Sequence, residues 1–220
     1  MLPSRPAALL FDLDGTLVDT VGTRIDAWLA VFEEVGLPAD RAMIAPLIGS
    51  DGRWLAREVA RRAGRELDEH DDEAIDRRSG ELFDERNRDP RPLPGVRACL
   101  GAADVAGIPW AIATSSRREQ TTRSVTALQL EREPTIVDGS HVEHAKPAPD
   151  LFLLAARTLG VDATGCWSVG DATWDMRASV AAGMTGIAIL AGSAASADEL
   201  RDAGATEVLG TLDELRERLG

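Results

Sequence analysis

Polar side chains able to do chemistry follow short apolar runs in this 220-residue chain, either where the β-strands would end or, for Lys146 and Asp175, a few residues further along the chain. The side chains with this placement are Asp12, Asp14, Thr114, Lys146, Asp171 and Asp175. Any one of them alone could be a turn residue or a helix cap. If the apolar runs are parallel strands of one sheet, however, their carboxyl ends meet at one crevice, where ligands bind. The sequence therefore predicts that these residues form a single site.

The acidic residues of this set predict a divalent cation. Asp12, Asp14 and Asp171 would concentrate negative charge in one place, which is costly unless a cation neutralises it. Mg²⁺ prefers oxygen ligands, and it is commonly bound by a few carboxylates with water in its remaining coordination positions. We therefore expect Mg²⁺ as the cofactor.

The other residues of the set predict a phosphate group as the ligand. Thr114, Ser115 and Lys146 offer hydrogen-bond donors and a positive charge to an anion with several oxygens. Asp12 and Asp14 can face the same ligand if the strand ends between them, and the glycine that follows permits that turn. One carboxylate could then attack phosphorus while the other handles the proton of the leaving group.

Six apolar runs predict the β-strands that must position these side chains. They are residues 7–11, 109–113, 135–137, 166–169, 185–190 and 207–209. The runs lack polar alternation, which is typical of strands buried on both faces. Helical segments separate them at residues 96–106, 119–128, 149–159, 176–182 and 197–203. This alternation predicts an α/β fold with a doubly wound, Rossmann-like parallel sheet.

Residues 17–89 interrupt the alternation, because they show helical periodicity and contain no convincing strand. The charged run at residues 65–76 within this stretch is expected to be a solvated helix and loop. We expect an α/β core domain of residues 1–16 and 90–220, and an inserted helical cap domain of residues 17–89.

The polar clusters resemble, in order along the chain, the four motifs of the haloacid dehalogenase-like (HAD) superfamily. The segments that carry the resemblance are FDLDGTL at residues 11–17, AIATS at 111–115, KPAPD at 146–150 and GDATWD at 170–175. The helical insertion between the first two motifs resembles the C1-type cap of the phosphoglycolate phosphatase and β-phosphoglucomutase branch. The resemblance therefore implies a capped, Rossmann-like enzyme.

The resemblance also implies roles for the acidic residues. Asp12 would be the nucleophile that forms an aspartyl-phosphate, and Asp14 would be the general acid and then the general base. The Asp12 carboxylate, the Asp14 backbone carbonyl and Asp171 would bind Mg²⁺. Asp175 would orient a metal-bound water from outside the first ligand shell, unless it merely caps the helix that follows.

For the phosphoryl group, the resemblance implies three further contacts. Thr114 and the Ser115 backbone N–H would hold the phosphoryl oxygens. Lys146, which is the single lysine of the chain, would bridge the Asp12 carboxylate and the phosphate.

Asp14 separates rival activities within the superfamily, because the dehalogenases lack an acid two residues after the nucleophile. With Asp at this position, the resemblance implies a Mg²⁺-dependent phosphatase acting on a small phosphomonoester metabolite. A sugar phosphomutase like β-phosphoglucomutase is the alternative. Arg24 occupies the position where those mutases have a His, and a permanently charged guanidinium cannot shuttle protons as imidazole does. The phosphatase is therefore favoured.

Two cap arginines are candidates for contacts with the substrate. Arg24 could hold an anionic group of the substrate, and Arg53 follows a glycine-containing loop that could reach the site. A non-enzymatic alternative is a phospho-receiver-type signalling domain, which also combines acids, a hydroxyl residue and a lysine on a doubly wound sheet. Such a domain would place its phospho-accepting Asp later than the first strand and would lack an insertion of this size.

The composition limits the other classes of partner. The chain has 37 acidic and 24 basic residues and a formal net charge of −13, which disfavours general binding to nucleic acid. No apolar run reaches the length of a membrane helix, and the first residues lack the layout of a signal peptide. We therefore expect a cytoplasmic enzyme with a small phosphorylated metabolite as its partner. The sequence leaves the identity of the substrate and the oligomeric state open.

Overall fold

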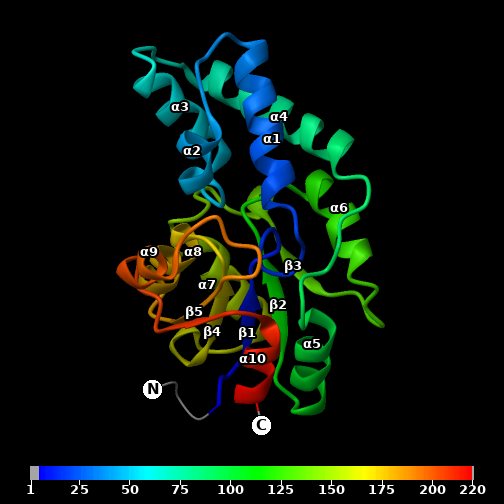
Figure 1. The fold of residues 1–220 in the computed structure, drawn as a ribbon. Helices are drawn as coiled ribbons and strands as arrows, with labels where there is room; N and C mark the ends of the chain where they lie inside the picture. Colours follow the sequence, from blue (N-terminus) through cyan, green and yellow to red (C-terminus); the bar gives the residue numbers. More distant parts are fainter. Residues whose placement is uncertain (1–4, 220) are drawn as a thin grey trace.

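The computed structural model describes residues 5–219, which form a six-stranded parallel sheet with helices on both faces (Figure 1). The strands are β1 (Leu9–Phe11), β2 (Trp110–Ala113), β3 (Thr135–Val137), β4 (Trp167–Gly170), β5 (Thr185–Ile189) and β6 (Glu207–Leu209). Their order across the sheet is β3-β2-β1-β4-β5-β6, so the strand order reverses at β1. The predicted doubly wound α/β fold is confirmed. The assignment of residues 1–4 and 220 to the core lies outside the described residues.

Alternate side chains of the strands point to opposite faces of the sheet and join different hydrophobic clusters. Leu9 and Phe11 of β1 pack in one cluster, and Leu10 between them packs in another. Helices α5 (Val96–Val105), α6 (Arg118–Ala127) and α10 (Leu212–Arg218) supply the first cluster. Helices α7 (Asp150–Leu159) and α8 (Thr173–Ala181) cover the other face, with α9 (Ala197–Asp202) against α8. Burial on both faces explains why the central strands β1 and β2 are apolar along their whole length.

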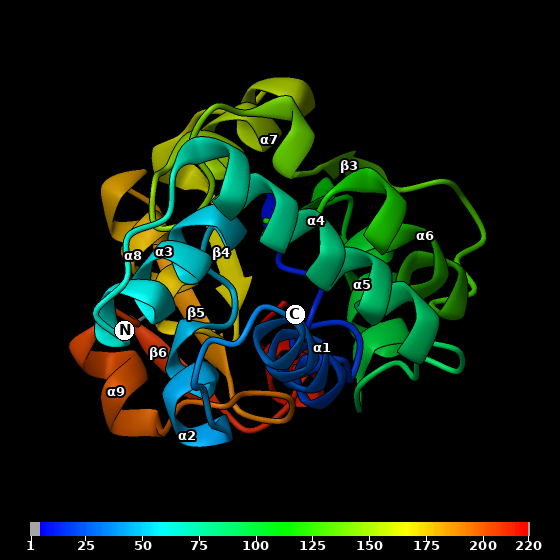
Figure 2. The same ribbon diagram turned by 90° about the horizontal axis from the view of Figure 1, so that it is seen from above.

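The inserted segment forms four helices, here called the cap, which lie beyond the carboxyl ends of the strands (Figures 1 and 2). They are α1 (Val21–Glu34), α2 (Arg41–Ile44), α3 (Gly52–Arg62) and α4 (Glu69–Arg86). Short 3₁₀ turns occur at η1 (Ala45–Leu47), η2 (Gly139–His141) and η3 (Ala163–Gly165). The cap has a hydrophobic cluster that includes Trp28, Phe32 and Phe83 and that extends to Trp174 of α8, whereas Leu17 and Val18 pack with the sheet.

The charged run at residues 65–76 is less solvated than the sequence predicts. Helix α4 begins within it, and the side chain of Asp72 is buried against Arg57 of α3. Asp76 faces the core domain, where it pairs with Arg117. The prediction of a solvated segment is therefore wrong for these two acids, because α3 and α6 pack against α4, and Arg57 of α3 and Arg117, just before α6, pair with them.

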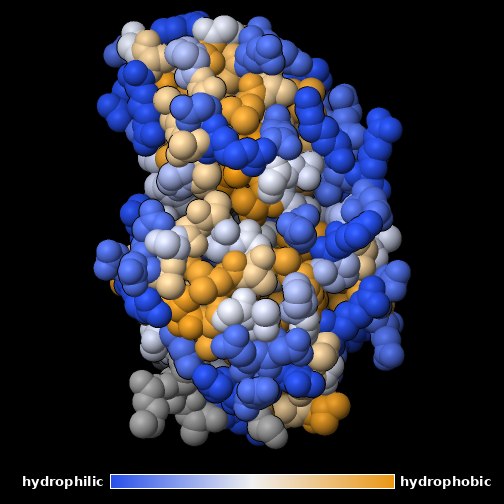
Figure 3. Space-filling view, viewed as in Figure 1, coloured by the Kyte–Doolittle hydropathy of each residue, from blue (hydrophilic) through white to orange (hydrophobic). Residues whose placement is uncertain are grey.

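The surface of the molecule is mostly hydrophilic around the outer faces of the cap (Figure 3). On the face shown, apolar side chains gather where the cap meets the core and below that level. Within residues 5–219, the structure contains no helix with both the length and the apolar character needed to cross a membrane.

Candidate active site

The central strands bring the predicted site residues to one edge of the sheet. Phe11 at the end of β1 is in register with Ile112 of β2 and with Val169 of β4. The residues that follow these three strands therefore lie side by side, at the switch in strand order where ligands bind in such sheets. The cap lies directly over this edge.

Lys146 occupies the centre of the cluster and is completely buried. Its Nζ donates a hydrogen bond to Asp12 Oδ1 at 2.6 Å and to the Ala113 carbonyl at 2.8 Å, and it lies 2.7 Å from Asp175 Oδ1. Burial alone would lower the pKa of Lys146, but the charges of Asp12 and Asp175 outweigh it and hold the pKa above its ordinary value. Lys146 is therefore a permanent cation between two carboxylates.

Three buried carboxylates surround this lysine. Oxygen atoms of Asp12, Asp171 and Asp175 all lie within 4.8 Å of one another. Thr16 donates a hydrogen bond to Asp171 Oδ1 at 2.9 Å, and the Ala172 N–H donates to Asp175 Oδ2 at 2.9 Å. Asp175 thus both closes the first turn of α8 and reaches the cluster.

The electrostatics of this cluster fit a bound divalent cation. Burial raises the pKa of Asp12 to about 7, although Lys146 opposes the shift. Burial, with the neighbouring charges of Asp175 and Asp12, raises the pKa of Asp171 well above its ordinary value. Three carboxylates face one ammonium group, so the ionised cluster carries excess negative charge that a Mg²⁺ ion would neutralise. The side chain of Asp14 lies outside this cluster, whereas Asp175 lies within it.

Asp14 faces the cap and is held by three donors. Thr20 donates to its Oδ1 at 2.6 Å, while Ser116 and Arg24 donate to its Oδ2 at 2.7 and 2.9 Å. Burial alone would raise the pKa of Asp14, but the charge of Arg24 and these hydrogen bonds outweigh it and lower the pKa. Asp14 is therefore ionised in this conformation.

Arg24, a predicted cap candidate, links the cap to the core. Besides Asp14, its guanidinium donates to Gln120 Oε1 at 3.0 Å and to the hydroxyl of Ser116 at 2.6 Å. Its Cζ atom also lies 3.5 Å from the centre of the Phe83 ring on α4. Both terminal nitrogens of its guanidinium are thus engaged with protein groups.

The two predicted phosphate-binding residues of the second motif lie at the same edge. Thr114 is buried, and its hydroxyl accepts a hydrogen bond from the Ser116 N–H at 3.1 Å. The Ser115 hydroxyl donates to the Gly49 carbonyl of the cap at 3.2 Å. Both residues line the same pocket as Asp12 and Asp14.

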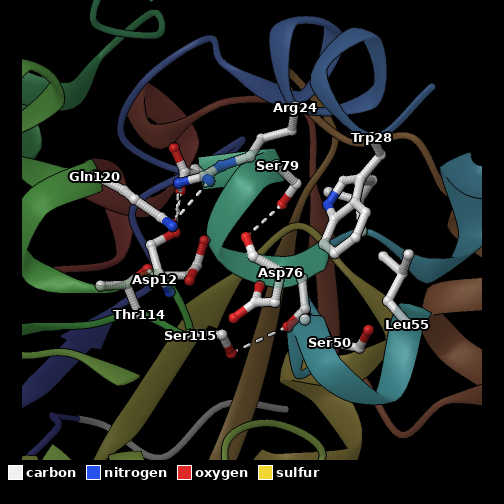
Figure 4. A pocket seen from close by; sticks show the side chains of 15 residues that line it. Asp12, Arg24, Trp28, Ser50, Leu55, Asp76, Ser79, Thr114, Ser115 and Gln120 are labelled. Carbon is white, nitrogen blue, oxygen red and sulfur yellow. Dashed lines mark hydrogen bonds and ion pairs between the residues drawn. The ribbon is translucent and has the colours of Figure 1, made fainter. Parts of the chain in front are cut away.

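This pocket lies between the cap and the core (Figure 4). The lining residues that the sequence did not single out include Trp28, Ser50, Asp76, Ser79, Ser116 and Gln120. Ser116 directly follows the second motif and could have been found from it, and Ser50 lies in the glycine-containing loop that was expected to reach the site. Nothing in the sequence marked the others as pocket residues. Arg53, the second predicted cap candidate, does not line the pocket; its side chain is 43% exposed and lies 3.8 Å from Asp51.

The chain combines a doubly wound parallel sheet, buried carboxylates at the carboxyl edge of that sheet, and a helical cap over them. This combination defines a class of capped α/β enzymes. The chain belongs to the haloacid dehalogenase-like hydrolase family, whose model matches residues 9–189. It is therefore a hydrolase of that family, and the predicted family and enzyme class are confirmed. The signalling-domain alternative is set aside, because the family match runs through the insertion.

Named relatives and a solved structure agree with this assignment. The chain is 35% identical over 189 residues to fructose-1-phosphate phosphatase YqaB of Escherichia coli, a match that covers 83% of this chain and 96% of that protein. It is 33% identical over 200 residues to a phosphoglycolate phosphatase of Xanthomonas campestris, with 85% and 84% covered. The crystal structure of a hydrolase from Pseudomonas syringae superposes with a TM-score of 0.90 at 30% identity, and covers 96% of this chain and 97% of that chain.

Proposed function

We propose that the protein is a Mg²⁺-dependent phosphatase that hydrolyses a small phosphomonoester metabolite through an aspartyl-phosphate on Asp12. The environment of Asp12 carries this proposal. Its Oδ1 accepts a hydrogen bond from Lys146 at 2.6 Å, beside the carboxylates of Asp171 and Asp175. Its Oδ2 accepts no hydrogen bond from residues 5–219 and is available to attack phosphorus. Relatives named as phosphatases of small phosphomonoesters support the same reaction.

In the first half of the reaction, Asp12 Oδ2 bonds to phosphorus as the bond from phosphorus to the ester oxygen breaks. Lys146 remains on Oδ1 and offsets the negative charge that gathers around the phosphoryl group. Thr114 and Ser115 hold the phosphoryl oxygens. Asp14 gives its proton to the leaving alkoxide, so this half yields a free alcohol and the aspartyl-phosphate.

The proposed Mg²⁺ ligands are the carboxylates of Asp12 and Asp171 and the backbone carbonyl of Asp14, with Asp175 available to accept a hydrogen bond from a water of the ion. When bound, Mg²⁺ would neutralise the buried carboxylates and the charge that develops on the phosphoryl oxygens. The raised pKa values of Asp12 and Asp171 support this site, because burial disfavours their charged forms and a bound cation would favour them.

In the second half, Asp14 takes a proton from water as the water oxygen bonds to phosphorus and the bond from phosphorus to Asp12 breaks. This step releases phosphate and restores both aspartates. The contacts from Thr20, Ser116 and Arg24 keep Asp14 ionised, which is the form that this step requires. The ion pair with Arg24 must loosen when the leaving group fills the pocket, because the first half needs the protonated form.

Arg24 also favours a phosphatase over a phosphomutase. Its guanidinium is buried between Asp14 and Gln120, and a guanidinium is not a proton relay as an imidazole is, so it cannot serve a second phosphoryl transfer in that way. Water is then the acceptor that Asp14 activates.

Hydrolysis of p-nitrophenyl phosphate with and without Mg²⁺ tests this proposal. The wild type should release phosphate only with Mg²⁺, and Asp12→Asn should lose turnover because the amide is not a nucleophile. Asp19→Asn is the matched control, since Asp19 lies exposed in the same loop and should keep wild-type turnover. Normal turnover of Asp12→Asn would refute the proposed nucleophile.

A further inference from the structure

Besides the apolar side chains of Ile48 and Leu55, the cap side of the pocket presents two serine hydroxyls, an indole and one carboxylate. These groups belong to Trp28 of α1, Ser50 before α3, and Asp76 and Ser79 of α4, and Gln120 of the core lies across from them (Figure 4). Hydroxyl and carboxylate oxygens suit the hydroxyl groups of a substrate, and an aromatic face suits the C–H face of a sugar-like chain. The residues on the cap side of the pocket, here called the cap wall, therefore help to determine which leaving group fits.

Free positive charge is missing from the same wall. Arg24 is the only basic residue among those of residues 5–219 that line the pocket. Its guanidinium is already shared among Asp14, Ser116 and Gln120 and stacks on Phe83. A second anionic group on the substrate would find no unpaired cation here to offset the loss of its hydration.

Asp76 adds negative charge to this wall. Its Oδ2 lies 2.9 Å from Arg117 Nη2, but Arg117 also pairs with Glu73 at 2.8 Å, so two carboxylates share one guanidinium. Its Oδ1 receives no donor from residues 5–219 and lies so close to Gly52 that a Cβ atom there would collide with it. Figure 4 shows the Asp76 side chain within the pocket, on the side toward Asp12 and Ser115.

We propose, on the basis of the phosphatase function above, that Asp76 selects substrates whose leaving group is a neutral, polyhydroxylated alcohol. Its free carboxylate oxygen accepts a hydrogen bond from a hydroxyl of the leaving group, and Ser50 and Ser79 add further polar contacts. The same oxygen repels a carboxylate at that place. Sugar or polyol phosphates are then accepted, and phosphate esters of hydroxy acids are rejected.

Two substrates with the same primary ester linkage test this selection. Fructose 1-phosphate has a neutral polyhydroxylated leaving group, and 2-phosphoglycolate has a carboxylate in its place. The wild type should show a kcat/KM at least about tenfold higher for fructose 1-phosphate. In Asp76→Asn this ratio should fall by about tenfold, because the repulsion of the carboxylate is removed. The ratio is measured within each variant, so a loss of folded protein does not change it.

Glu81→Gln is the matched control, since Glu81 is an exposed acid of the same helix α4 that pairs with Arg78 and does not line the pocket. Its substrate ratio should equal that of the wild type. A wild type that prefers 2-phosphoglycolate, or an equal shift of the ratio in both variants, would overturn the role of Asp76. In that case, Mg²⁺-dependent hydrolysis of p-nitrophenyl phosphate would still support the proposed phosphatase function. If this hydrolysis were absent, both the phosphatase function and the role of Asp76 would be overturned.

Discussion

Replacing Lys146 by methionine removes the one positive charge inside a buried acidic cluster while keeping a long, unbranched side chain. In the wild type, Nζ lies 2.6 Å from Asp12 Oδ1, 2.7 Å from Asp175 Oδ1 and 2.8 Å from the Ala113 carbonyl. The variant leaves those carboxylates and that carbonyl buried without their donor. We therefore expect a large loss of stability in the metal-free protein.

The magnitude follows from the burial of the cluster. Breaking a buried ion pair by removing one partner costs about 3–5 kcal/mol, because an uncompensated charge remains. The variant can reduce this cost by keeping Asp12 protonated, which is easier at pH 6 than at pH 8 because the pKa of Asp12 is already about 7 with the lysine present. The loss in the free energy of unfolding should therefore be about 3–5 kcal/mol at pH 8. It should be smaller at pH 6, by up to about 1.4 kcal/mol per pH unit for each proton that the folded variant retains and the unfolded chain releases.

Urea unfolding in EDTA at both pH values measures this loss. Arg157→Met is the matched control, because Arg157 is an exposed basic residue on α7 and its replacement should change stability by less than about 0.5 kcal/mol. Saturating Mg²⁺ should recover part of the loss in the lysine variant, since the ion neutralises the same carboxylates. A loss below about 1 kcal/mol, or one that is the same at pH 6 and pH 8, would refute the reasoning.

Two further predictions concern the carboxylates. Asp14→Asn should lower turnover of an alkyl phosphate by about 10²–10⁴-fold, because the amide can neither give nor take the proton; steady-state kinetics measure this, and unchanged turnover would exclude the acid–base role. The pKa of Asp12 is raised from 3.8 to about 7 on folding, so the metal-free protein should lose stability as the pH rises from about 4 through 7. Mg²⁺ prefers the ionised form, so the increase in Tm that it causes should be larger at pH 8 than at pH 5.5; an equal increase at both would contradict the assigned site.

The sheet was predictable because its four inner strands are buried almost throughout and its two edge strands are short runs between helices. The runs at residues 135–137 and 207–209 correspond to β3 and β6, and the other four runs differ from their strands by at most two residues at either end. The grouping of Asp12, Lys146 and Asp171 was predictable for the same reason, since the carboxyl ends of neighbouring parallel strands must meet.

The cap side of the pocket was not predictable, because it depends on how helices from distant segments pack. Asp76 stands in a charged run that reads as solvated, and it faces the pocket only because α4 lies against α6 and Arg117. Arg53, by contrast, was expected to reach the pocket and does not line it. The buried face of α3 is formed by Leu55 and Val59, and Arg53 lies beside Asp51 with much of its side chain exposed.

The central claim is that Asp12 receives the phosphoryl group, and trapping that adduct tests it most directly. In Asp14→Asn, a substrate with a good leaving group such as p-nitrophenyl phosphate still phosphorylates the enzyme, because its departure needs no proton, whereas hydrolysis of the adduct is slowed. Acid quenching after one turnover, followed by peptide mass spectrometry, should locate a phosphoryl group on Asp12. A phosphoryl group on another residue, or release of phosphate with no adduct at any time, would contradict the account.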